Sequence, residues 1–165
     1  GRTTSMKHLL AFLFLLPVFA RAGSPWFSRM EDGDRIELTQ HSQGCFHDNT
    51  TYYEVKRTKD SYLFTEYLIT WKPGPTPQIA EKKARGTLTL TAQEVAGLDA
   101  LLEFFRGKKS VGSTTTVSLI VECHEAGRLV AVENLFDGSG GHGLDSRKDV
   151  TTFYALANRL GGNAR

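Results

Sequence analysis

The stretch that decides the fold is TTTVSLIVECHEAGRLVAVENLF, residues 114–136. Large aliphatic residues alternate with polar ones through its first half, 114–122, which is typical of a strand with one buried face. Glu125-Ala126-Gly127 is a turn signal, and RLVAVENLF (128–136) reads as the returning strand. A link this short joins antiparallel neighbours, so the segment predicts a β-hairpin.

Four earlier segments are predicted strands: 35–39, 52–57, 61–71 and 86–90. The segment 61–71 (SYLFTEYLITW) carries aromatic residues on both faces, which favours the centre of the sheet. We expect turns at 48–50 and 58–60. Three prolines make Lys72–Pro77 an extended loop.

Two helices are predicted. Thr91-Ala92-Gln93-Glu94 is a capping box, in which Thr91 and Glu94 satisfy each other's backbone N–H groups. The helix that follows ends at Gly107 and carries one apolar stripe: Val95, Leu98, Leu101, Leu102 and Phe105. In the second helix, Val150, Phe153, Ala157 and Leu160 recur at helical spacing, with Ser146 or Asp149 as the N-cap and Gly161-Gly162 at the end.

The predicted element order is β-β-β-β-α-β-β-α, with hairpin-length links. This order favours an α+β fold: an antiparallel sheet of five or six strands with two helices packed on one face.

Residues Met6–Ala22 have the features of a secretory signal peptide. Leu9–Ala20 is an apolar run of twelve residues, about 18 Å as a helix and short of the ~30 Å core of a bilayer. Small residues flank Arg21, where a signal peptidase reads. We therefore expect an exported protein, periplasmic or extracellular, with no stable membrane insertion after cleavage.

The domain organisation follows from the expected cleavage after Ala22. Residues 1–22 form an upstream extension plus the cleaved signal peptide, and 23–33 an N-terminal tail in which Trp26 and Phe27 pack. Residues 34–162 form a single α+β domain, and 163–165 a C-terminal tail.

Charge argues against a nucleic-acid partner. The whole chain has a net charge of +2, but Arg2, Lys7 and Arg21 leave with the signal, so 17 basic residues face 18 acidic ones. Both signs are interspersed, and no basic stripe suited to tracking phosphates is present.

The chain has two cysteines, Cys45 and Cys123. In an oxidising compartment we expect them to form one disulfide, the alternative being two buried free thiols. Such a disulfide would bring His47 and His124 into neighbouring segments, a weak indication of zinc or copper without a third ligand. Asn49 begins a glycosylation sequon, which matters only in a host that glycosylates exported proteins.

The loop 137–145 (DGSGGHGLD) combines four glycines with polar side chains, and its candidate binding residues are Asp137, Ser139, His142 and Asp145. We expect it to be exposed, mobile and dispensable for folding, and to contact a partner if it has a function. One alternative is a hydrolase loop using Ser139 and His142, although no G-x-S-x-G elbow is present. Another is a loose metal site on Asp137, His142 or Asp145, and the EF-hand pattern itself fails.

No motif for a cofactor occurs, so we expect none, and we expect no catalytic residues or metal site. The sequence favours a small exported, non-enzymatic binding protein, an inhibitor or immunity-type partner of another protein. The alternative is an exported hydrolase that uses Ser139 and His142.

The first prediction concerns processing. The exported protein should begin at or near Gly23, because the small residues before it form the cleavage site. Intact-mass measurement of material recovered outside the cytoplasm checks this, and a mass that includes Met6–Ala22 would indicate an anchored protein instead.

Overall fold

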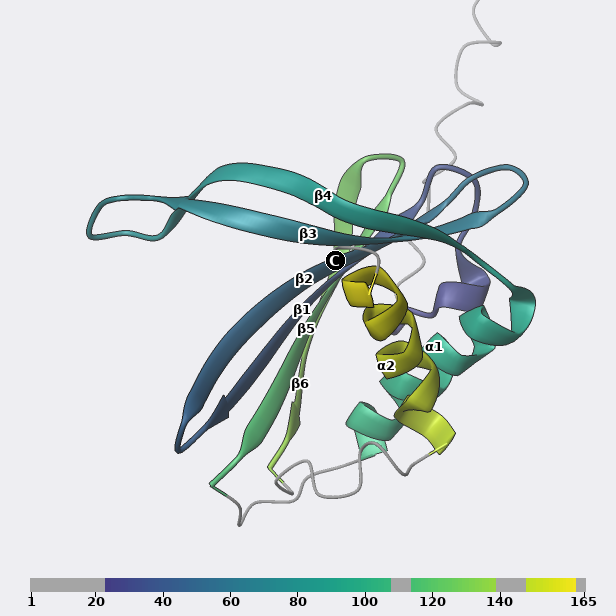
Figure 1. The fold of residues 1–165 in the computed structure, drawn as a ribbon. Coiled ribbons are helices and arrows are strands. Elements are labelled where there is room, and N and C mark those ends of the chain that lie inside the picture. Colours follow the sequence, from purple (N-terminus) through teal and green to yellow (C-terminus); the bar gives the residue numbers. More distant parts are fainter. Residues whose placement is uncertain (1–22, 108–113, 139–147, 163–165) are drawn as a thin grey trace, which may run out of the picture.

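The computed structural model describes residues 23–107, 114–138 and 148–162 (Figure 1). Its elements, in chain order, are η1 (Phe27–Arg29), β1 (Arg35–Gly44), β2 (His47–Arg57), β3 (Tyr62–Lys72), β4 (Gln78–Leu90), α1 (Ala92–Gly107), β5 (Thr116–Glu125), β6 (Arg128–Asp137) and α2 (Lys148–Gly162).

The six strands form one sheet in the order β4-β3-β2-β1-β5-β6, and every neighbouring pair is antiparallel. Both helices lie on the same side of this sheet (Figure 1). The α+β class and the sheet with two helices are confirmed. No helix in the described part of the chain has the length and apolar character needed to cross a bilayer.

Alternation along β1 defines the two faces of the sheet. Ile36 and Leu38 are fully buried beneath the helices, while Arg35 and Glu37 point the other way. We call the helix-covered side the inner face and the opposite side the outer face. Residues paired across neighbouring strands share a face, so the register of β1 with β2 and β5 assigns the rest of the sheet.

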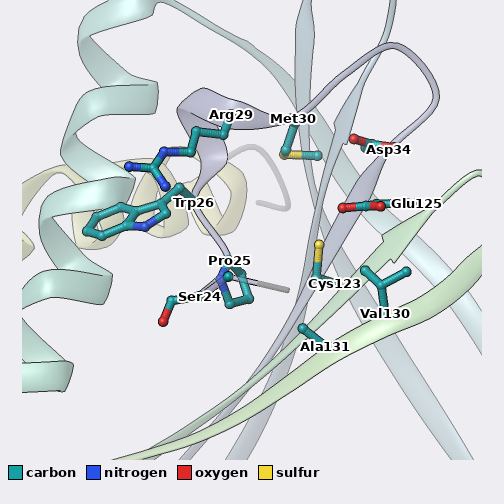
Figure 2. Close-up of a pocket in the computed structure, with 11 residues that line it drawn as sticks. Ser24, Pro25, Trp26, Arg29, Met30, Asp34, Cys123, Glu125, Val130 and Ala131 are labelled. Atoms are coloured by element: carbon teal, nitrogen blue, oxygen red, sulfur yellow. The ribbon is translucent and has the colours of Figure 1, made fainter. Parts of the chain in front are cut away.

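Residues 23–33, predicted as a tail, pack onto α1 and one end of the inner face. Phe27 is fully buried, and its backbone N–H donates to Asp99 Oδ1 of α1 over 2.6 Å. Arg106 Nη2 donates to the carbonyl of Pro25, also over 2.6 Å. This segment, with Cys123 and parts of β6, encloses a cavity of about 60 Å³ (Figure 2). That volume is far below the ~300–1,000 Å³ typical of small-molecule sites.

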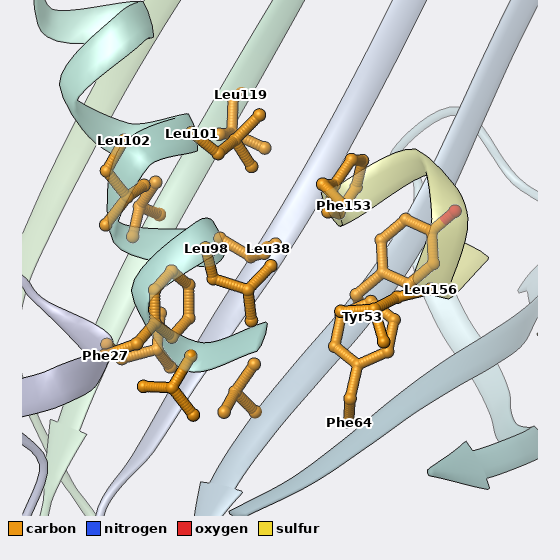
Figure 3. Packing of buried hydrophobic residues seen from close by; sticks show 14 of the residues in the cluster. Phe27, Leu38, Tyr53, Phe64, Leu98, Leu101, Leu102, Leu119, Phe153 and Leu156 are labelled. Carbon is orange, nitrogen blue, oxygen red and sulfur yellow. The ribbon is translucent and has the colours of Figure 1, made fainter. Parts of the chain in front are cut away.

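The core lies between the inner face and the two helices (Figure 3). The predicted stripe of α1 is buried as expected, and Leu98 and Leu102 are completely inaccessible. From α2, Phe153 meets Tyr53 and Phe64 of the sheet, with ring centroids 5.1 and 6.3 Å away. Both contacts are edge-to-face, the geometry that aromatic quadrupoles favour.

The capping box at the start of α1 is confirmed. The Thr91 N–H donates to Glu94 Oε2 over 2.7 Å, and the Glu94 N–H donates to Thr91 Oγ1 over 3.2 Å. The hydrogen bond from the Thr91 backbone lowers the pKa of the Glu94 carboxyl, and Arg159 of α2, which pairs with the same carboxylate, lowers it further.

Gly97 brings the helices into close contact. A Cβ built on Gly97 would lie 2.3 Å from Thr152 Oγ1 and 2.5 Å from Thr152 Cβ, distances that real Cβ atoms do not adopt. Only glycine therefore fits where α1 crosses α2.

Several predicted strand boundaries and one predicted strand position were wrong. The first turn is at Cys45-Phe46, since 48–50 continue β2, and β4 starts at Gln78, well before Gly86. The segment 61–71 is not central. It pairs with β2 only as far as Tyr67, and its remaining residues pair with β4 alone.

The predicted disulfide between Cys45 and Cys123 was also wrong, and both cysteines are free. Cys123 is paired with Ile36 near the start of β1, whereas Cys45 follows Gly44 at its end. Nine residues of strand separate these positions, about 30 Å at ~3.3 Å per residue, and a disulfide needs Cα atoms within about 7 Å. β1 runs five residues further than the predicted 35–39 and so carries Cys45 away.

The second prediction tests the helix crossing. Gly97→Ala should destabilise the protein by about 1–2 kcal/mol, because overpacking costs about 1–3 kcal/mol and alanine regains at most ~1 kcal/mol of helix propensity. Gly107→Ala is the control, since nothing lies within 4 Å of its added Cβ. Urea denaturation of both variants gives the comparison, and a Gly97→Ala variant as stable as Gly107→Ala would contradict the close crossing.

The third prediction separates the two thiols. Cys45 is exposed and should react with a maleimide at pH 8 in the native protein. Burial raises the pKa of the Cys123 thiol to about 11, so about one molecule in a thousand carries the reactive thiolate at that pH. Cys123 should therefore react slowly until the protein is denatured, and faster as the pH rises towards its pKa.

Mass spectrometry after labelling gives the number of maleimide labels on each protein molecule. Two labels under denaturing, non-reducing conditions and one under native conditions are expected. The variant Cys123→Ser should keep the native label. If no label is found after denaturation, the two cysteines form a disulfide and the free thiols described here are wrong.

Candidate interaction surface

The outer face, on the side of the sheet away from both helices, carries large apolar side chains in solvent. Ile120 of β5 and Val132 and Phe136 of β6 point outward, because their strand neighbours Leu119, Val121 and Leu135 face the core. They are 37, 48 and 44 % exposed, respectively. We call Ile120, Val132 and Phe136 the apolar triad.

A second apolar group lies on an extension of the sheet. Beyond Tyr67, β3 continues with β4 as its only partner, so residues 68–83 form a two-stranded arm that leaves the body of the sheet (Figure 1). Trp71 and Ile79 are a cross-strand pair on this arm, each 47 % exposed. Trp71 lies 6.2 Å from Tyr52 of β2, measured between ring centroids, so the pair faces the same side as the rest of the outer face.

Charged residues lie between these two apolar groups. The register places Glu37 of β1 between Glu54 of β2 and Glu122 of β5, and we call these three residues the acidic row. Like charges on directly opposed strand positions repel one another. Two cations offset this repulsion at Glu37. Arg35 Nε is 3.2 Å from Glu37 Oε1, and Lys82 Nζ is 3.2 Å from Glu37 Oε2.

Lys82 also ties the arm to the body of the sheet. Its Nζ lies 4.4 Å from the centroid of the Tyr67 ring on β3 while it contacts Glu37 on β1, three strands away. The Tyr67 hydroxyl donates to Glu54 Oε1 over 3.3 Å. Burial, followed by the nearby Glu54, raises the pKa of Tyr67, so this hydroxyl stays a donor at neutral pH.

Glu37, Glu122 and His124 resemble a metal site in composition, since one ligand atom from each lies within 4.8 Å of the others. Arg35 argues against this function. Its Nη2 is 3.3 Å from His124 Nδ1, and a guanidinium can only donate, so Nδ1 is the acceptor and Nε2 carries the proton. His124 therefore presents an N–H, not a lone pair, to Glu37 Oε1 at 3.9 Å. Within this group, Glu37 is instead paired with the cations Arg35 and Lys82.

The candidate binding residues and the two histidines that the sequence analysis named are not brought together on the outer face. Asp137 ends β6 and is fully buried, so it is not part of an exposed loop. Ser139, His142 and Asp145 lie outside the described residues. His47 is paired with Gly44 and His124 with Arg35, at opposite ends of β1, so the sheet does not bring these two histidines together.

The residues of the outer face were missed because they look ordinary in the sequence. Glu37, Glu122 and Val132 are simply the other half of an alternating pattern. A signal was present: Ile120, Val132 and Phe136 are apolar at positions where an alternating strand normally turns polar residues to solvent.

Comparison of the chain with models of protein families, with curated proteins and with solved structures found no match.

Proposed function

We propose that this is an exported, non-enzymatic protein that binds another protein through the outer face of its sheet. One observation carries the proposal: the apolar triad and the Trp71–Ile79 pair leave five large apolar side chains partly exposed on the face that lies away from both helices. Apolar side chains gathered on one exposed face are typical of interaction sites.

The composition of the face resembles a protein interface. Tryptophan and tyrosine dominate binding energy when a partner excludes water from them, and Trp71 and Tyr52 are adjacent here. The acidic row, with Arg35 and Lys82, supplies fixed charges between the apolar groups. Such charges orient a partner and discriminate against wrong ones more than they add affinity.

The hydrolase alternative depends on Ser139 and His142, and no observation on the described residues favours it. Binding to a protein also agrees with the expectation of an inhibitor or immunity-type role, for which a rigid sheet surface needs no catalytic group.

The fourth prediction tests the face by affinity capture. Purified wild-type protein should retain a specific partner from the exported fraction of its source. The triple variant Ile120→Thr, Val132→Thr, Phe136→Thr should lose at least about tenfold in affinity, because it removes apolar contact area while threonine preserves strand propensity.

The matched control is the double variant Phe46→Thr, Leu68→Thr. Both residues are exposed and apolar, but Phe46 lies in the β1–β2 turn and Leu68 on the opposite side of the arm. It should bind as the wild type does. Undiminished capture by a correctly folded triple variant would contradict the outer face as the interface, and a wild type without a specific partner would contradict the proposed function.

A further inference from the structure

A second surface feature, separate from the outer face, is an open cleft of about 630 Å³ between α2 and the inner face. It lies where β3 diverges from β2, so that α2 covers the sheet only in part. Ligand sites for small molecules are typically about 300–1,000 Å³, so this cleft is of the right size, unlike the 60 Å³ cavity beside Cys123.

The floor of the cleft holds a shielded ion pair. The side chain of Glu66 on β3 is only 7 % exposed, and its Oε1 accepts from Arg85 Nη1 of β4 over 3.0 Å. The Arg85 side chain is 34 % exposed and lines the cleft. The two charges cancel, and the floor therefore offers several hydrogen-bonding atoms without net charge.

Uncharged polar groups continue this lining. Gln40 Nε2 of β1 donates to the Tyr154 hydroxyl of α2 over 3.3 Å and so joins the two walls. Asn158 lies one helical turn beyond Tyr154 and also lines the cleft. Tyr53 stands beside Glu66, and burial followed by the Glu66 charge raises its pKa to about 12, so its hydroxyl keeps its proton.

We propose that this cleft binds a neutral saccharide. Amide, carboxylate and guanidinium groups each present two hydrogen-bonding atoms in one plane, which suits neighbouring hydroxyl groups that both donate and accept. An apolar ligand would displace water from these polar groups without replacing the hydrogen bonds that the water makes. Because Glu66 and Arg85 neutralise each other, the floor carries no net charge that would attract an anion or a cation, so a ligand without net charge fits best.

The test is a titration of ¹⁵N-labelled protein with four neutral trisaccharides: maltotriose, cellotriose, laminaritriose and triacetylchitotriose. At least one should shift the side-chain amide signals of Gln40 and Asn158. Gln40→Ala should lower the affinity for that saccharide about tenfold, the scale expected for lost hydrogen bonds. Asn134→Ala, an exposed amide on the outer face, should leave its affinity unchanged.

Glycylglycine is titrated in parallel, because a zwitterion could engage Glu66 and Arg85 separately. Binding of glycylglycine alone, or no shift with any of the four saccharides, overturns the proposal. The triple threonine variant of the outer face should still bind the saccharide, so failure of this inference and failure of the proposed function are distinguishable.

Discussion

The close crossing of α1 and α2 is the constraint on which the rest of the structure depends. Because Gly97 has no side chain, the backbone of α1 approaches Thr152 directly, and both helices fit over one face of the sheet. Leu98 and Leu102 on one helix and Phe153 on the other then reach the same core. Covering one face with both helices leaves the outer face uncovered by either.

Much of the fold could be predicted because its signals are local. The capping box of Thr91 and Glu94 and the hairpin at Ala126-Gly127 need only residues a few positions apart. The pairing of β1 with β5 has no such signal, since it joins segments about eighty residues apart. The same gap explains the mistaken disulfide: two cysteines in one sequence give no measure of how far along a strand each one lies.

The candidate surface was harder to predict than the fold, for a physical reason. Glu37 acquires its neighbours Glu54 and Glu122 only through the register of three strands, and Lys82 of β4 reaches it only across β3 and β2. The glycine-rich loop attracted attention through composition alone, yet Asp137, its one described residue among the four candidates, is buried in the domain. Unusual composition and functional geometry are different properties of a chain.

The strand order also has a consequence for how the chain folds. The strands β1 to β4 form a meander in which each hairpin closes a short loop, whereas the joining of β1 to β5 closes a long loop that contains β2 to β4 and α1. Loop-closure entropy makes such a non-local step slow relative to hairpin formation. We therefore expect the four-stranded meander to form early and the β5–β6 hairpin to dock afterwards. Until it docks, the open edge of β1 is the part of the nascent sheet most exposed to pairing with another chain.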